Sequence, residues 1–138
     1  MRNITWQYVA GFFDGEGCVW WCVGRRGPQA SMSQVLPEVL YDIRDFLAEY
    51  GIVANLRRQS YSAGSFKSSA EKTKSLEIQG EINCIKFLSF IAPYLHTKKR
   101  IYAYDILRFH TAYPPISDQQ RTRLSHESRW KKKRELYR

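Results

Sequence analysis

The sequence has little that would suit a secreted or membrane protein. It contains three cysteines among 138 residues, an odd number that argues against a disulfide framework and agrees with a reducing compartment. No apolar run approaches the roughly 20 residues that a membrane-spanning helix needs, and the first residues, MRNITWQY, lack the apolar stretch of a secretory signal. We therefore expect an intracellular protein, in the cytoplasm, the nucleoid or an organelle, with no membrane partner.

Acidic residues are also few relative to basic ones. The chain has 22 lysines and arginines against 13 aspartates and glutamates, with a formal net charge of +9 and a pI near 9.6. This balance favours a polyanionic partner, and nucleic acid fits better than a membrane. With 43% hydrophobic and 14% aromatic residues, the chain can build one domain with a real core, which excludes disorder throughout.

The metal-binding residue types give no strong zinc signal. Cys18 and Cys22 are spaced as a metal pair could be, but they lie in an alternating stretch where both side chains would point to one face of a strand. Cys84 is far from them along the chain, and the three histidines are scattered. We favour packing or surface roles for these residues over a zinc site.

Hydrophobic periodicity divides the chain into helices and strands. The expected order is a helix ending near residue 16, strands over 17–26 and 29–35, a helix from Pro37 to Gly51, strands over 52–61 and 73–79, and helices over about 81–92 and 98–112. On the helix over 81–92 we expect Ile82, Ile85, Leu88 and Ile91 on the buried side, and Thr97 is the expected N-cap of the last helix. Two hairpins with helices on one face make an α+β fold whose other sheet face is left for a partner. The basic loops imply that this partner is DNA.

We divide the chain into a core over residues 1–112 and a basic C-terminal extension over 113–138, which begins at Pro114-Pro115. The extension either packs on the core as a helix, lies along a DNA backbone as a basic arm, or stays solvated.

The most informative segment is YVAGFFDGEGCV, from Tyr8 to Val19. Small Ala10 and Gly11 leave one stripe of the expected helix bare, so that another helix can approach it closely. Glu16 falls just beyond the last turn, where the unpaired carbonyls and the negative end of the helix dipole favour a cation. A carboxylate there is a hard oxygen ligand suited to Mg²⁺.

This segment resembles the LAGLIDADG motif of homing endonucleases, matched as VAGFFDGEG with Ala10, Gly11, Asp14, Glu16 and Gly17 in their expected places. A buried helix ending in an acidic glycine turn is the blander interpretation, but such turns do not require this ordered set of small, apolar and acidic residues. The resemblance implies an αββαββα saddle over roughly residues 5–112, a four-stranded antiparallel sheet backed by helices. Because only one motif is found, it also implies a homodimer with Ala10 and Gly11 at its interface.

The resemblance implies a sequence-specific double-strand DNA endonuclease that cleaves a long pseudo-palindromic site by metal-dependent phosphodiester hydrolysis. Glu16 and the carbonyl of Gly15 would bind two or three Mg²⁺ ions per dimer active site, with no small-molecule cofactor. Lys98 corresponds to a basic residue near the scissile phosphate, and a lysine at a helix N-terminus adds its charge to unpaired amides. Alternatively, Lys98 and its basic neighbours only bind backbone phosphates. Gln34 is the candidate for a polar catalytic residue, although base reading would explain it about as well.

Alternation also selects the side chains that would face DNA. Val19, Trp21, Leu56, Leu76 and Ile78 are expected in the core. The expected DNA contacts are Cys18, Trp20, Cys22, Arg25, Arg26, Gln34, Asn55, Arg57, Gln59, Ser75, Glu77, Lys99 and Arg100.

Two other functions fit the same sequence. One is an RNA maturase or a non-cleaving DNA-binding protein of the same fold, and the other is a nonspecific basic scaffold. A noncatalytic relative has no need of Glu16 or Lys98, so the presence of both favours the enzyme.

Overall fold

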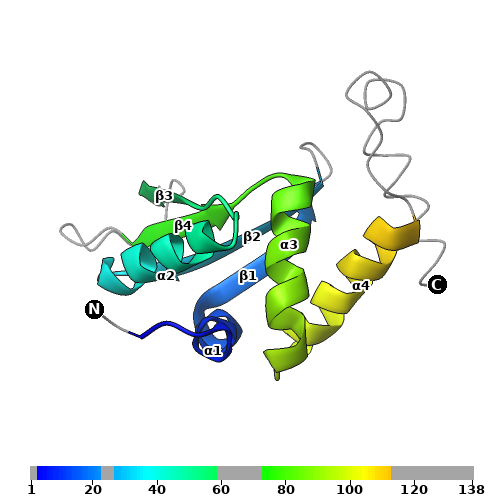
Figure 1. Cartoon of the computed structure of the whole chain (residues 1–138), viewed down its shortest axis with the longest axis horizontal. Helices are drawn as coiled ribbons and strands as arrows, with labels where there is room; N and C mark the ends of the chain where they lie inside the picture. Colours follow the sequence, from blue (N-terminus) through cyan, green and yellow to red (C-terminus); the bar gives the residue numbers. More distant parts are fainter. Residues whose placement is uncertain (1–2, 23–26, 59–72, 113–138) are drawn as a thin grey trace, which may run out of the picture.

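The computed structural model describes residues 3–22, 27–58 and 73–112 (Figure 1). Its elements are α1 (Trp6–Glu16), β1 (Gly17–Cys22), β2 (Gly27–Gln34), α2 (Glu38–Glu49), β3 (Asn55–Arg58), β4 (Lys74–Ile78), α3 (Glu81–Ile91), the short 3₁₀ turn η1 (Ala92–Tyr94) and α4 (Lys98–Ala112). The predicted order of helices and strands is confirmed. The predicted C-terminal extension, Arg25, Arg26 and Gln59 lie outside the described residues.

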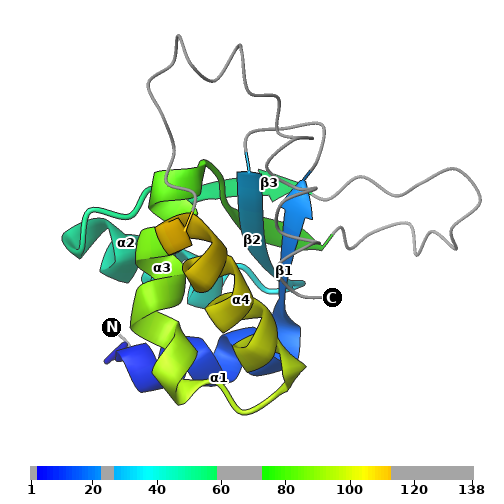
Figure 2. The ribbon, with the colours of Figure 1, turned by 90° about the vertical axis from the view of Figure 1, so that its right-hand side faces the viewer.

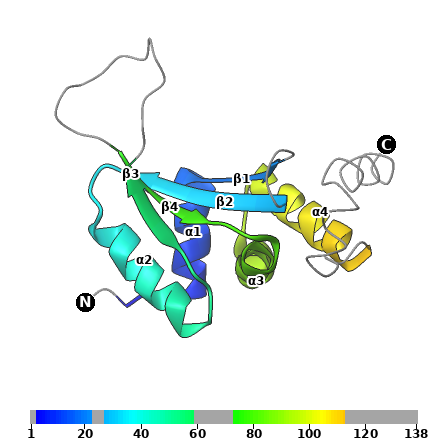
Figure 3. The same cartoon turned by 90° about the horizontal axis from the view of Figure 1, so that it is seen from above.

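The strands form one four-stranded antiparallel sheet in the order β1-β2-β4-β3. The helices lie on one face of this sheet, and the other face is open in the described part of the chain (Figure 3). The α+β class is therefore confirmed, with the helices segregated as predicted. None of the helices described here has the length and apolarity to cross a membrane.

The ends of the helices follow from local sequence. Thr5 caps α1, because its hydroxyl accepts a hydrogen bond from the Tyr8 N–H at 3.1 Å. At the end of α2, Gly51 has φ +73°, and two hydrogen bonds of 3.1 Å run from its N–H to the carbonyl of Ala48 and from the Ile52 N–H to that of Leu47. This Schellman arrangement needs a left-handed residue, which explains the glycine that was predicted to close the helix.

The core lies between the helices and the sheet. Its largest fully buried side chains include Phe13 of α1, Met32 of β2, Leu76 of β4, and Phe87 and Leu88 of α3. Trp21 of β1 is nearly buried and packs edge-on against Phe109 of α4, with ring centroids 4.6 Å apart. The predicted core positions of β1 and β4 are confirmed, and Leu56 of β3 is half-buried against the same core.

The buried face of α3 differs from the prediction. Leu88 and Ile91 are buried, but Ile82 is 48% exposed and Ile85 only half-buried, while Cys84 and Phe87 take the central positions. The helix is apolar on several sides, so its spacing fits more than one buried stripe. Burial in this core raises the pKa of the Cys84 thiol, with the neighbouring charge of Glu81 acting in the same direction.

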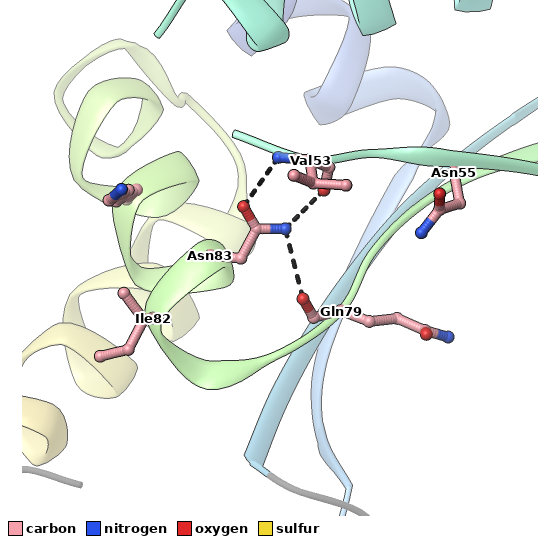
Figure 4. Close-up of a pocket in the computed structure, with 6 residues that line it drawn as sticks. Val53, Asn55, Gln79, Ile82 and Asn83 are labelled. Atoms are coloured by element: carbon pink, nitrogen blue, oxygen red, sulfur yellow. Dashed lines mark hydrogen bonds between the residues drawn. The ribbon is translucent and has the colours of Figure 1, made fainter. Parts of the chain in front are cut away.

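Asn83 fastens the first turn of α3 to the chain on both sides of the β3–β4 hairpin (Figure 4). Its side-chain oxygen accepts from the Val53 N–H at 2.9 Å, and its amide nitrogen donates to the carbonyls of Val53 and, at 3.2 Å, Gln79. The surface hollow beside it is lined by Val53, Asn55, Gln79, Ile82, Asn83 and Lys86. The amide thus takes the place of a strand partner for Val53.

Candidate active site

Glu16 lies at an abrupt junction between helix and strand. It is the last residue of α1, its side chain is exposed, and β1 begins at the next residue, Gly17. The Gly17 N–H donates to the carbonyl of Phe13, and a Cβ atom at Gly17 would lie 2.3 Å from the Phe13 ring. Because Phe13 is fully buried and cannot retreat, a glycine is required here. The tightly packed backbone at this junction therefore holds the Glu16 carboxylate at the surface.

The bare stripe of α1 is made by Gly11 and Gly15. Both are exposed, and no atom of the described chain lies within 4 Å of a Cβ built on either. Their i, i+4 spacing places them on one side of the helix. The expectation for Ala10 needs correction, because its side chain is 0% exposed within the core of its own chain. Consecutive residues such as Ala10 and Gly11 point about 100° apart on a helix and cannot share one stripe.

The end of α1 lies beside the segment that leads into α4 (Figure 2), and the Asp14 side chain connects the two. Its Oδ2 accepts from the His96 N–H at 2.8 Å, and its Oδ1 accepts from the Thr97 N–H at 3.1 Å and from the Thr97 hydroxyl at 2.6 Å. Burial pushes the pKa of this carboxyl upward, but the hydrogen bonds from Thr97 and His96 outweigh it, so the pKa lies below its ordinary value. Asp14 is thus held as a carboxylate.

The two lysines at the start of α4 have different surroundings. Lys98 is the first residue of the helix, and its side chain is exposed. The ammonium group of Lys99 instead donates to the carbonyls of Phe13 at 3.0 Å and Asp14 at 2.7 Å. Thr97 is the N-cap, as predicted, and its hydroxyl accepts from the Lys99 N–H at 3.2 Å. The structure therefore brings the start of α4 to the end of α1 that carries Glu16.

The remaining catalytic candidate, Gln34, is the last residue of β2. In the sheet register Gly17 pairs with Met32, so Gln34, at the end of an interior strand, lies two residues beyond the partner of the first residue of β1. Its side-chain oxygen accepts from the Val35 N–H at 3.0 Å. Side chains alternate along a strand, so Gln34, two residues after buried Met32, points to the side of the sheet that the helices cover and not to the open face.

The open sheet face carries most of the predicted DNA contacts whose side chains the structure describes. Cys18, Trp20, Asn55 and Arg57 are exposed, and Arg100 at the start of α4 is exposed as well. Glu77 is half-buried, and its Oε2 lies 3.1 Å from Arg57 Nε and accepts from Gln79 Nε2 at 3.0 Å. The backbone of Cys22 lies in β1, but its side chain is outside the described part of the structure.

Ser75 points to the open face of the sheet, as predicted, but its side chain is only 6% exposed. It sits in register between Ser33 of β2 and Arg57 of β3, in the middle of the sheet, where neighbours cover a short side chain. Four polar residues on the same face were missed, namely Gln29, Ser31, Ser33 and Gln79. In β2 the sequence did indicate them, because Gln29, Ser31 and Ser33 alternate with Ala30 and Met32, which are buried.

The junction offers hard oxygen donors but an incomplete metal site. The Glu16 carboxylate and the Gly15 carbonyl are the ligand types that Mg²⁺ prefers, and both residues are exposed. Among the described residues, no three His, Cys, Asp or Glu side chains are grouped so that they could hold a metal ion. The donor set fits a divalent ion that takes its other ligands from outside this chain, such as phosphate oxygens or a second subunit.

Comparisons with known proteins agree with the fold described above. A family model described as a LAGLIDADG-like domain matches residues 5–92, and a search of curated proteins found no match. Among solved structures, the fold is similar to the homing endonuclease I-CvuI in complex with its target, with a TM-score of 0.59 and 19% identity over 82% of this chain and 69% of that one. The LAGLIDADG meganuclease I-AabMI bound to uncleaved DNA matches at 0.59 and 20%, over 86% of this chain and 39% of that one. The intron-encoded homing endonuclease I-CeuI complexed with DNA matches at 0.60 and 15%, over 90% and 63%.

Proposed function

Since this chain belongs to the LAGLIDADG-like domain family, we propose that it is a site-specific double-strand DNA endonuclease that works as a homodimer with a divalent metal. The similar structures are those of DNA-bound homing endonucleases, and the I-CvuI complexes were obtained with 2 mM Ca or 2 mM Mg. The observation that carries the proposal is the junction itself. It joins an exposed carboxylate, the lysine-bearing start of α4 and the first residue of β1, from which the sheet with its open polar face continues.

The open face supplies the surface for DNA. A twisted antiparallel ribbon fits the major groove, where each base pair presents its own pattern of donors and acceptors. Exposed Trp20, Asn55 and Arg57 give this face apolar, amide and guanidinium groups. A mixed surface of this kind reads base edges, whereas a uniformly basic one would only bind phosphates.

The exposed stripe of α1 supports a dimer. Nothing within the described chain requires glycine at position 11 or 15. Each glycine within a helix destabilises it by about 0.5–1 kcal/mol relative to alanine. That cost is offset if a second copy of α1 packs against the stripe backbone to backbone. In a symmetric dimer the two Glu16 side chains would lie near the same axis, one for each DNA strand.

Within this site the roles divide among few residues. Glu16, with the Gly15 carbonyl, would hold Mg²⁺, which when bound supplies charge stabilisation for phosphodiester hydrolysis. Lys98 would place its ammonium group toward the negative charge of the phosphate. Gln34, at the end of β2 and on the helix side of that strand, would orient a water rather than contact a base edge.

Cleavage of a randomised duplex library in the presence of Mg²⁺, followed by sequencing of the cut ends, tests the proposal. We expect wild-type protein to yield one long pseudo-palindromic site cut on both strands, and EDTA to abolish the cuts. Glu16→Gln should bind the same site without cutting it. The matched control is Glu49→Gln, which should cut like wild type. Glu49 is an exposed glutamate at the end of α2, next to Tyr50, whose ring packs on Trp6 at the opposite end of α1 from Glu16. Specific binding without cleavage by the wild type would instead indicate a noncatalytic member of the family.

A further inference from the structure

We infer that Asp14, Thr97 and Lys99 form a reciprocal clamp that positions Lys98 for the reaction, and that Lys99 itself is not a phosphate-binding residue. The inference rests on the proposed function, since it assigns a role to residues around the proposed Lys98. It gives the two adjacent lysines different roles: Lys98 acts on the phosphate, and Lys99, expected from the sequence to contact DNA, positions Lys98 instead.

The first half of the clamp runs from α1 to the start of α4. Both carboxylate oxygens of Asp14 are engaged, one by the N–H of His96 and the other by the N–H and hydroxyl of Thr97. Two consecutive backbone N–H groups bound by one carboxylate fix the orientation of the peptide between them. Because Thr97 is the N-cap of α4, fixing it also fixes where the helix begins and how it is rotated.

The second half runs in the opposite direction. Lys99 Nζ donates to the carbonyl of Phe13, which also accepts from the Gly17 N–H, and to the carbonyl of Asp14 in the last turn of α1. A cation there also interacts favourably with the negative end of the helix dipole. The ammonium group also lies 5.9 Å from the centroid of the Phe13 ring. A lysine held by two carbonyls and an aromatic face has little left to offer a DNA phosphate.

The direction of Lys98 follows from this arrangement. Neighbouring residues on a helix point about 100° apart, so a helix anchored through Lys99 turns Lys98 away from the α1 carbonyls. The Lys98 side chain is exposed, while that of Lys99 is half-buried. Asp14, two residues before Glu16 in the motif, thereby connects the metal-binding end of α1 to the lysine.

A double-mutant cycle tests the clamp. Displacing Lys98 by about 1 Å should cost about 100-fold in rate, so we expect Asp14→Asn to lower kcat by that order while the Kd for the target changes little. Lys98→Met should lower kcat as well, and adding Asp14→Asn to it should cause little further loss. If Asp14→Asn lowers the rate equally in both backgrounds, Asp14 does not act through Lys98 and the inference is overturned.

Two matched pairs separate positioning from general damage. Thr97→Ser keeps the hydroxyl and should retain the rate, whereas Thr97→Val should lose it. Asp45→Asn, at an exposed aspartate of α2, should match wild type. If Lys99→Met lowers kcat relative to wild type and leaves the DNA affinity unchanged, the clamp is supported. A fall in DNA affinity with a smaller salt dependence would instead show that Lys99 binds phosphate.

A readout without cleavage keeps the two proposals distinct. In Asp14→Asn the backbone amides of His96 and Thr97 should exchange with solvent hydrogen faster than in wild type, with the global unfolding transition preserved. If the wild type cuts no DNA, the proposed function fails, and this exchange experiment still decides whether the clamp exists. Unchanged exchange at both amides would refute it.

Discussion

Arg57 and Glu77 pair diagonally across β3 and β4 on the open face of the sheet, with Arg57 Nε 3.1 Å from Glu77 Oε2. The same oxygen accepts a hydrogen bond from Gln79 Nε2. Glu77 therefore holds a long, otherwise mobile arginine side chain in one direction. Because the pairing uses Nε, it orients the guanidinium plane, and arginine recognises guanine with a pair of N–H groups on O6 and N7.

We predict that Arg57 determines a guanine preference at one position of each half-site. Arg57→Lys keeps the charge but removes bidentate recognition, and should cost about 1–3 kcal/mol of discrimination at that position. Glu77→Gln should relax the same position less, since it removes only the orienting charge. Binding selections on a randomised duplex library measure both effects, with Glu49→Gln as the unchanged control. Uniform weakening over all positions would show that Arg57 contacts a phosphate instead.

The dimer is tested at the glycine stripe. Gly11→Leu should leave the fold intact, because no atom of the described chain lies within 4 Å of a Cβ at that position, while preventing a second α1 from approaching. Analytical ultracentrifugation should show a dimer for wild type and a monomer for the variant. Ala48→Leu, at an exposed position on α2, is the matched control and should remain dimeric. A dimeric Gly11→Leu protein would contradict the packing of α1 against its copy.

Much of this site could be predicted from the sequence because its signals are local. Alternation identified exposed Trp20 and Arg57 and buried Leu76 correctly. The carboxylate at the end of a glycine-flanked helix depends only on residues adjacent in the chain, and Glu16 indeed ends α1. Periodicity is reliable wherever one face is apolar and the other polar.

The rest depends on contacts that no local pattern encodes. Asp14 and Thr97 are separated by 83 residues, so nothing near either residue indicates the hydrogen bonds between them. Spacing alone could not identify the buried side of α3, because the isoleucines and the pair Cys84 and Phe87 define two different apolar sides of the helix. The placement of Ala10, by contrast, could have been found from helix geometry, because only Gly11 and Gly15 lie on a common side.

The two glycines at the end of α1 should differ sharply in their effect on stability. Gly17→Ala forces a methyl group against the buried Phe13 ring, and overpacking of this kind costs about 1–3 kcal/mol. Gly15→Ala meets nothing within 4 Å and should stabilise the helix by about 0.5–1 kcal/mol. Urea unfolding measures both, in a Gly11→Leu background so that dimerisation does not contribute. Equal effects at the two positions would contradict the contact of Gly17 with Phe13.

The Asp14 carboxylate should make the stability of the fold dependent on pH. Its pKa is lowered in the folded protein by the hydrogen bonds from Thr97 and His96, which outweigh the opposing effect of burial. A group of this kind contributes stability above its unfolded pKa of about 4, and the contribution is lost as the pH falls through the lower folded value. The difference in unfolding free energy between wild type and Asp14→Asn should therefore be largest near neutral pH and shrink below about pH 4. Urea titrations of both proteins between neutral pH and pH 3 measure it, with Asp45→Asn as the reference for an exposed aspartate. A difference that stays constant over this range would mean that the hydrogen bonds do not favour the ionised form, and that Asp14 joins α1 to α4 through its shape alone.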